Sequence, residues 1–146
     1  MFGLFSKKYW YHFYLPAEVI YHLSEVNNSE LKAFLTNENI KFSRIDIQKI
    51  SDYLGYVSIS FKTNNELSYF KKYISKFKEL IPPWSAFPNL FQGAPRWNQG
   101  YEEDYCIKNW VPYWRSLNAL QKQQYMAKFN CPIEWKEWFK ENKMLD

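Results

Sequence analysis

The side chains that most often carry out catalysis are few in this sequence. Only two of the 146 residues are histidines and two are cysteines. His12 lies in a run of aromatic residues, which predicts a packed, hydrogen-bonded core position, and neither it nor His22 has a cysteine or carboxylate at metal-site spacing. Cys106 would need a histidine brought to it by the fold to act as a nucleophile. The sequence therefore predicts no catalytic residue, no metal ligand and no cofactor.

Three carboxylates follow one another at Glu102, Glu103 and Asp104. At the start of a helix such residues interact favourably with the positive end of the helix dipole, which is a structural role. The same run is also suited to a negative patch that meets a basic partner. Metal binding is disfavoured, because consecutive helical residues point in different directions. The structural and the partner-binding interpretations both stay open.

Tryptophan and arginine are the side chains most favoured as anchors of protein interfaces. Trp84 and Trp97 lie in a proline-rich segment, and Arg96 precedes Trp97. We therefore expect contacts with a protein partner at Trp84, Arg96 and Trp97, together with the carboxylates at 102–104. Four other tryptophans form two pairs spaced four and three residues apart, which predicts buried helix faces. They are Trp110, Trp114, Trp135 and Trp138.

The most regular helix pattern covers residues 66–80, with Asn64 or Asn65 as its N-cap. Its apolar residues recur in steps of three and four, so they share one face. They are Leu67, Phe70, Ile74, Phe77 and Ile81. The remaining positions carry Lys71, Lys72, Lys76 and Lys78. With Tyr69 and Tyr73 these lysines resemble the charge and stacking groups that bind single-stranded nucleic acid, although a solvated helix face explains them and is favoured.

The segments before this helix predict a small antiparallel or mixed sheet in the order β-α-β-β-α. Strands are expected at 8–15, 40–47 and 56–63, and a helix at 30–37 with Ser29 as its N-cap. Residues 17–26 predict either a helix or an irregular segment. Strand 8–15 has bulky residues on both faces, so it is expected inside the sheet or covered on both sides. In the last strand Val57, Ile59 and Phe61 are expected to point inward.

The second half predicts a loop and three helices. Residues 82–101 hold four prolines and two glycines, which favours an ordered loop. Helices are expected at 102–115, 117–129 and 133–142, with Pro112 interrupting or kinking the first. The fold class is therefore α+β, with a small N-terminal sheet and a helical, Trp-rich C-terminal half. We expect one domain over 1–146, made of a β/α unit at 1–81, the loop at 82–101 and a helical part at 102–146.

Composition and charge exclude several classes of protein. The formal charge is 19 − 15 = +4, and neither half is strongly basic, so nucleic acid is an unlikely partner. Four glycines nearly exclude a glycine-rich phosphate loop. Apolar runs are far shorter than the roughly 20 residues that span a bilayer, and the N-terminus lacks the order of a signal peptide. We expect a cytoplasmic protein that does not contact membranes.

An aromatic pattern runs from Pro82 to Phe139. It reads Pro83-Trp84-x-x-Phe87-Pro88, Arg96-Trp97-x-x-Gly100-x-x-Glu103-x-Tyr105, Trp110-x-x-x-Trp114-x-x-Leu117, Tyr125 and Pro132-x-x-Trp135-x-x-Trp138-Phe139. It resembles small bacterial cytosolic proteins, several of which look like immunity proteins of contact-dependent or other polymorphic toxin systems. The resemblance implies a protein that binds one toxin domain and blocks its active site or partner surface, and it carries over no catalytic residue.

Three hypotheses follow. The leading one is a non-enzymatic immunity or inhibitor protein that neutralises a cognate bacterial toxin domain. The alternative is a nucleic-acid-binding module that uses the lysine-rich helix 66–80. The third is an enzyme, which would need a pocket assembled around His12 or the carboxylates. Immunity proteins of nucleases are often acidic, whereas this chain is basic, so either the toxin contact is local, through a patch such as 102–104, or the toxin surface is not basic.

Overall fold

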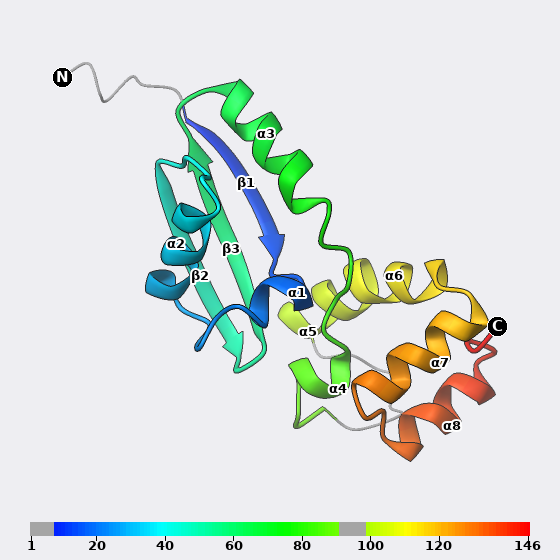
Figure 1. Cartoon of the computed structure of the whole chain (residues 1–146). Coiled ribbons are helices and arrows are strands. Elements are labelled where there is room, and N and C mark those ends of the chain that lie inside the picture. The colour runs from blue at the N-terminus through cyan, green and yellow to red at the C-terminus, as the bar shows by residue number, and fades with distance from the viewer. Residues whose placement is uncertain (1–7, 91–98) are drawn as a thin grey trace. The chain divides into compact units, whose positions relative to one another are not determined.

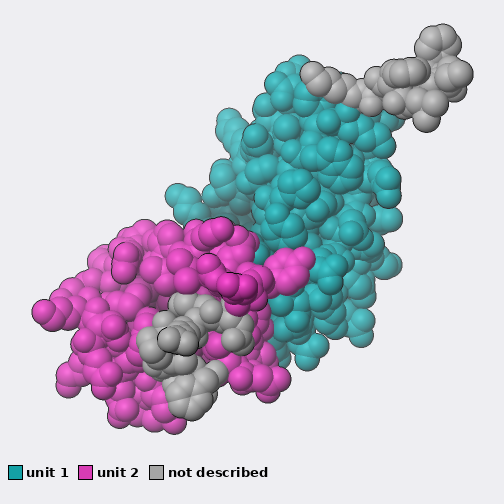
Figure 2. Space-filling view, turned by 180° about the vertical axis from the view of Figure 1, so that it is seen from behind, with its two compact units in different colours: residues 1–79 teal, residues 80–146 magenta. Residues whose placement is uncertain are grey.

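The computed structural model describes residues 8–90 and 99–146. The chain divides into two compact units, Met1–Glu79 and Leu80–Asp146 (Figure 2). A three-stranded sheet with helices forms the first, and the described part of the second is helical, so the predicted α+β class is confirmed. That the units form one domain stays a prediction. Within the described ranges, no helix combines the length and the apolar character needed to cross a membrane.

The sheet of the first unit is antiparallel, with its strands in the order β1-β3-β2 (Figure 1). The strands are β1 (Tyr9–Tyr14), β2 (Arg44–Ser51) and β3 (Leu54–Phe61). The inward residues Val57, Ile59 and Phe61 of the central strand are fully buried, as their alternation predicts. The position predicted for β1 is wrong, because β1 is an edge strand and Trp10 on it is 44% exposed.

Two helices pack on the inner face of this sheet. The helices of the unit are α1 (Ala17–Ile20), α2 (Asn28–Asn37) and α3 (Asn64–Ile74). Phe70 of α3 is fully buried, with ring centroids 5.5 Å from Phe13 of β1 and 5.3 Å from Phe61 of β3. The hydroxyl of Tyr73 donates to Glu38 Oε1 over 3.0 Å and so links α3 to the end of α2. Both helices therefore lie on the same side of the sheet (Figure 1).

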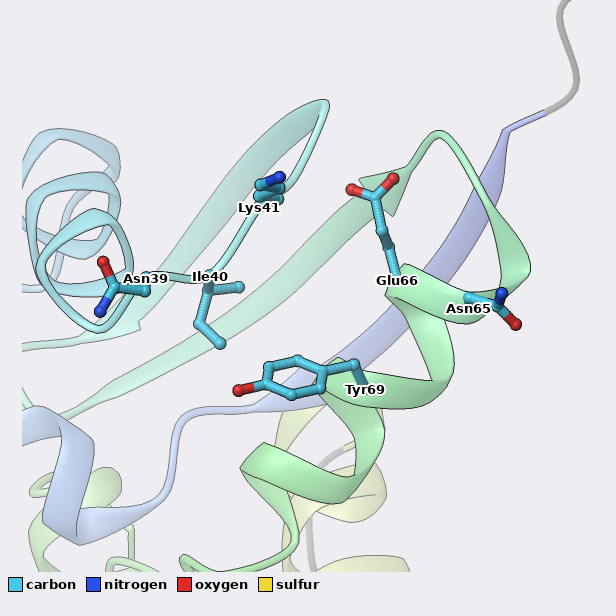
Figure 3. Close-up of a pocket in the computed structure, with 6 residues that line it drawn as sticks. All are labelled: Asn39, Ile40, Lys41, Asn65, Glu66 and Tyr69. Atoms are coloured by element: carbon cyan, nitrogen blue, oxygen red, sulfur yellow. The ribbon is translucent and has the colours of Figure 1, made fainter.

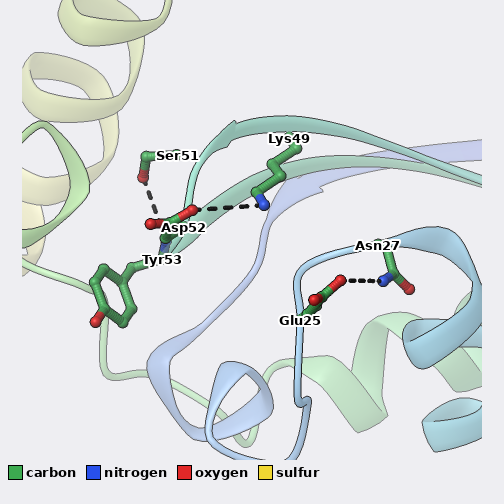
Figure 4. Close-up of polar contacts among 6 residues, drawn as sticks. All are labelled: Glu25, Asn27, Lys49, Ser51, Asp52 and Tyr53. Carbon is green, nitrogen blue, oxygen red and sulfur yellow. Dashed lines mark hydrogen bonds and ion pairs between the residues drawn. The ribbon is translucent and has the colours of Figure 1, made fainter.

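Several element boundaries differ from those predicted. The N-cap of α2 is Asn27, whose side chain accepts a hydrogen bond from the Glu30 amide over 2.8 Å. The N-cap of α3 is Thr63 instead of Asn64 or Asn65, and its hydroxyl accepts a hydrogen bond from the Glu66 amide over 3.1 Å. Helix α3 ends at Ile74 instead of residue 80. The second strand starts at Arg44 instead of residue 40, because residues 38–43 first close helix α2 and then lead into the sheet. It continues to a turn in which Lys49 pairs with Asp52 over 3.5 Å (Figure 4).

Three helices end in the same way, at a residue with positive φ. These residues are Asn39 (61°) after α2, Asn130 (51°) after α7 and Lys143 (56°) after α8. In each case the following amide donates back across the last turn, for example Ile40 to the Leu35 carbonyl over 3.0 Å. The residues that follow are all buried: Ile40, Cys131 and Met144. This is the Schellman arrangement, which closes a helix and buries an apolar side chain beyond it.

Helices form the described part of the second unit. They are α4 (Pro83–Ala86), α5 (Tyr101–Glu103), η2 (Asp104–Trp110), α6 (Val111–Ser116), α7 (Ala119–Lys128) and α8 (Ile133–Glu141). In its described part, the predicted loop 82–101 contains the helical turn α4 and the first residue of α5. The predicted helix 102–115 is divided by η2, a π-helix, which directly precedes Pro112. Since a proline lacks an N–H and its ring collides with the carbonyl four residues earlier, the wider π turn accommodates Pro112.

An aromatic core holds the second unit together. Trp110, Trp114 and Trp135 are buried, as their spacing predicts, whereas Trp138 is half-buried. The rings of Trp110 and Trp114 stack with centroids 5.3 Å apart, and Phe139 stacks on Trp114 at 4.5 Å. Large aromatic side chains bury much apolar surface, which lets short helices form a stable core.

Tyrosine hydroxyls bind the start of this unit to the core. Tyr105 donates to the Ile81 carbonyl over 2.6 Å, and Tyr125 donates to the carbonyl of Leu80. The Tyr125 oxygen also accepts the indole N–H of Trp110 over 3.0 Å. The two prolines that follow have no N–H, so this segment cannot pair as a continuous strand. The hydroxyls satisfy its carbonyls instead.

Candidate functional site

The sheet face opposite α2 and α3 carries a group of polar and aromatic side chains. Alternate residues of each strand point to this face, and the register aligns them across the sheet. We call it the outer sheet face and define it by Trp10, His12, Tyr14, Arg44, Asp46, Gln48, Tyr56, Ser58 and Ser60. Trp10, His12, Arg44, Asp46 and Gln48 are exposed. These exposed side chains are polar, charged or aromatic.

A row of rings crosses the outer sheet face from β1 to β3. The rings of Trp10 and His12 are nearly parallel, with an interplanar angle of 5° and centroids 6.3 Å apart. His12 and Tyr56 are also nearly parallel, at 8° and 6.1 Å. Tyr14 completes the row with its centroid 4.9 Å from that of Tyr56. Three π faces are thus held in a common orientation.

Polar groups surround these rings. His12 Nδ1 and Ser58 Oγ are 2.8 Å apart, and Asp46 lies beside Ser58 on the neighbouring strand. Asn28 reaches the same place from α2, because its Oδ1 accepts the Ile47 amide over 2.7 Å. An open pocket of about 610 Å³ results, lined by Trp10, His12, Asn28, Arg44, Ile45, Asp46 and Ser58. A volume of this size is ordinary for small-ligand sites.

The pocket does not have the order of a catalytic triad. In a triad the histidine lies between the serine and the carboxylate, so that the carboxylate orients the imidazole. Here Ser58 is the middle residue, paired in register with His12 on one side and Asp46 on the other. The structure does assemble a pocket around His12, as the enzyme hypothesis requires. The prediction of a buried His12 is wrong, because its ring is hydrogen-bonded but exposed.

Positive charge gathers at the Trp10 end of the outer sheet face. Arg44 and Trp10 both pair with Ser60, one from each side. Lys8 and Lys62 are the residues next to the Tyr9–Phe61 pair, just outside the two strands, and both are exposed. The hydroxyl of Ser60 is buried between these neighbours and has no hydrogen-bond partner in the described structure.

A second surface lies on α5 and η2, where sequence analysis placed three partner-binding residues. Glu102, Glu103 and Asp104 are half-exposed in the first turns, and Asp104 pairs with Lys108 over 3.8 Å. Two large apolar side chains of the same short segment are more exposed, Tyr101 at 41% and Ile107 at 44%. We call these six residues the α5–η2 surface. It combines carboxylates suited to a basic partner with apolar groups suited to anchor it.

The other three predicted partner residues have different positions. Trp84 is half-buried, and its indole N–H donates to the Phe129 carbonyl over 2.9 Å. Its ring packs against Trp135 with centroids 5.5 Å apart, so the aromatic core accounts for it. Arg96 and Trp97 lie outside the described residues. A partner contact at these three residues stays a prediction.

The lysine-rich helix has its charges on the surface. Lys71, Lys72, Lys76 and Lys78 are exposed, and Tyr69 is 64% exposed. Beside it lies a small, mainly apolar pocket of about 260 Å³ between α3 and the chain that follows α2 (Figure 3). Ile40, Tyr69 and Glu66 are among its lining residues. Its position on the helical side separates it from the outer sheet face.

Neither cysteine has the environment of a nucleophile. Cys106 is fully buried, and this burial raises the pKa of its thiol well above the usual range, with the Glu102 charge adding to the shift. Burial also raises the pKa of Cys131, to about 12. Both are free thiols. Among residues 8–90 and 99–146 no three His, Cys, Asp or Glu side chains converge as they would around a metal ion.

Sequence reasoning missed the outer sheet face. The available signal was the bulky alternation of Trp10 and His12 against Tyr11 and Phe13, but it was interpreted as two covered faces. No protein-family model, curated protein or solved structure matches the chain. The resemblance to immunity proteins therefore stays an expectation.

Proposed function

We propose that the chain is a non-enzymatic immunity protein that binds a cognate bacterial toxin domain in the cytosol and neutralises it. The observation that carries the proposal is the α5–η2 surface. There Tyr101 and Ile107 expose apolar area in the same two turns that carry three carboxylates. The aromatic pattern that resembles immunity proteins includes part of this same surface.

Charge makes a local contact possible for a chain that is basic as a whole. The three carboxylates and Lys108 give the surface a formal charge of −3 + 1 = −2, against +4 for the full chain. A basic toxin groove would be attracted to this side, since electrostatic complementarity steers encounter and fixes orientation. Tyr101 and Ile107 would then exclude water around the charged pairs. Inhibition follows from covering the groove and needs no chemical step.

Growth protection tests the proposal. Each open reading frame next to the gene is expressed from an inducible promoter, in cells with and without this protein. One of these frames should arrest growth, and the present chain should relieve the arrest and co-purify with the toxic product. If no arrest is relieved, the proposed function is wrong. A pull-down of the tagged chain from its native host, followed by mass spectrometry, identifies the partner independently.

A pair of matched variants tests the surface. Glu102→Lys with Glu103→Lys should abolish protection and weaken binding by at least about 100-fold, because like charges would then face each other. Glu134→Lys with Glu137→Lys makes the same change in charge on α8, where both residues are exposed, and should keep protection. Equal protection by both double variants would exclude the α5–η2 surface and leave the function standing.

A further inference from the structure

We propose that the outer sheet face is a binding site for single-stranded nucleic acid, in which bases stack on Trp10, His12 and Tyr56 and phosphates pair with the cations at the Trp10 end. This site lies in the first unit and does not depend on the proposed toxin partner. Sequence analysis assigned nucleic acid to the lysine-rich helix, if anywhere. The structure provides a more suitable arrangement on the other side of the sheet.

The ring row supplies the stacking surface. Proteins that bind single strands place bases against aromatic side chains, and sheets with outward aromatic residues are a recurring platform for this. Trp10 is 44% exposed, so its face is accessible. The near-parallel orientation of Trp10, His12 and Tyr56 means that one strand crossing from β1 to β3 meets them in succession. Little reorganisation is needed on binding.

The cations supply the backbone contact. Arg44, Lys8 and Lys62 lie on both sides of Trp10, where a phosphate attached to a stacked base would lie. Arginine binds phosphate through two parallel hydrogen bonds, and lysine adds positive charge. Asp46 is the only carboxylate among the residues that define the outer sheet face. Its negative charge would repel a phosphate placed close to it. The phosphate contact is therefore expected at the Trp10 end.

Donors and acceptors for base edges lie within the same pocket. Asn28, Ser58 and Asp46 line it, and Asn28 Nδ2 donates to Asp46 Oδ1 over 3.4 Å, so a base edge would have to replace such bonds. The buried Ser60 hydroxyl, which lacks a partner in the described chain, lies between Trp10 and Arg44. A protein partner is the less suitable occupant, since the exposed side chains of the defined face are polar, charged or aromatic and offer little for a dry interface core.

Fluorescence anisotropy tests the site on the full chain. The probe is a fluorescein-labelled oligouridylate of about ten nucleotides, matching the footprints of known single-strand binders. Binding should be measurable in low salt, and affinity should fall steeply between about 50 and 200 mM salt. Unlabelled uridine monophosphate in excess separates two sources of the same chemistry. Excess uridine monophosphate should leave the labelled strand bound. If uridine monophosphate displaced the strand as well as an unlabelled strand does at equal concentration, the site would belong to free nucleotides and the proposal would be overturned.

Variants locate the binding. Trp10→Ala should weaken binding by about 5- to 140-fold, which is the stacking contribution of one base. Arg44→Gln should reduce the slope of log affinity against log salt by about one. Both side chains are exposed, so folding is preserved, which circular dichroism checks.

The control is placed on the opposite side of the sheet. Tyr69→Ala and Lys72→Gln remove an exposed aromatic and an exposed cation from α3, and should leave affinity unchanged. Loss of binding in these variants instead would transfer the site to the lysine-rich helix and overturn the proposal. Absence of binding at about 100 µM protein in low salt, the weak end of non-specific affinities, would do the same. Neither result bears on toxin neutralisation.

Discussion

Removing one oxygen atom from Tyr125 should destabilise the second unit more than its size suggests. The Tyr125 hydroxyl accepts the indole N–H of Trp110 over 3.0 Å and donates to the Leu80 carbonyl. Tyr125→Phe keeps the ring and its packing, for example against Phe129 with centroids 4.7 Å apart. It leaves the Trp110 indole N–H and the Leu80 carbonyl without the hydrogen bond that each makes to this hydroxyl. The variant therefore isolates the hydrogen bonds from the packing.

The magnitude follows from the burial of the two groups. Trp110 is fully buried, so water cannot replace the lost acceptor, and an orphaned donor of this kind costs about 1–3 kcal/mol. Leu80 is half-buried, which lets water reach its carbonyl, and the loss of an ordinary hydrogen bond costs about 0.5–1.5 kcal/mol. The free energy of unfolding should therefore fall by about 2–4 kcal/mol.

Urea unfolding followed by tryptophan fluorescence measures this loss. All tryptophans except Trp10 belong to the second unit, so the signal reports its unfolding. The midpoint should fall without a change in slope, because the buried surface is unaltered. Tyr69→Phe, at a side chain 64% exposed, is the control and should stay within about 0.5 kcal/mol of wild type. Equal midpoints for the two variants would refute the reasoning.

Three further perturbations have defined outcomes. Gly55→Ala should cost about 1–3 kcal/mol in a thermal melt, since the new Cβ would lie 2.8 Å from Val26 Cγ1 in the core. Lys143→Gly should raise the melting temperature, equivalent to about 1 kcal/mol, because its φ of 56° suits glycine better. Burial raises the thiol pKa values of Cys106 and Cys131, so both should resist a thiol reagent at pH 8 until urea unfolds the chain. The folded state then keeps protons that the unfolded state releases above about pH 8.5, so the urea midpoint should fall as pH rises from there towards 12.

Sequence patterns predicted those features that depend on local periodicity. Val57, Ile59 and Phe61 alternate cleanly, and one face of β3 is buried accordingly. The spacing of Trp110 and Trp114 placed them correctly in the core. In both cases the spacing of apolar residues within one strand or helix decides which of its faces is buried. The other elements only have to pack against that face.

Features that depend on how elements pair were not predictable in this way. Trp10 and His12 were expected to be covered, but the strand order β1-β3-β2 puts them on an edge strand and on the face away from the helices. The cap of α2 shows the same limit. Asn27, Asn28 and Ser29 are all good caps by type, and the structure uses Asn27, while the Asn28 side chain accepts the Ile47 amide from β2. Tertiary contacts selected among locally equivalent residues.

The π turn before Pro112 sets the length of the chain between two buried rings. In an ordinary α-helix, residues five apart are separated by about 140° around the axis, because each residue advances by about 100°. Tyr105 and Trp110 are five apart and yet both fully buried. Deleting one residue between them would leave the two rings four apart in an ordinary α-helix, only about 40° apart around the axis, so Tyr105 would keep its side and its bond to Ile81. In natural relatives of this chain, a single-residue deletion between these two rings should therefore be tolerated, whereas a further insertion there should not.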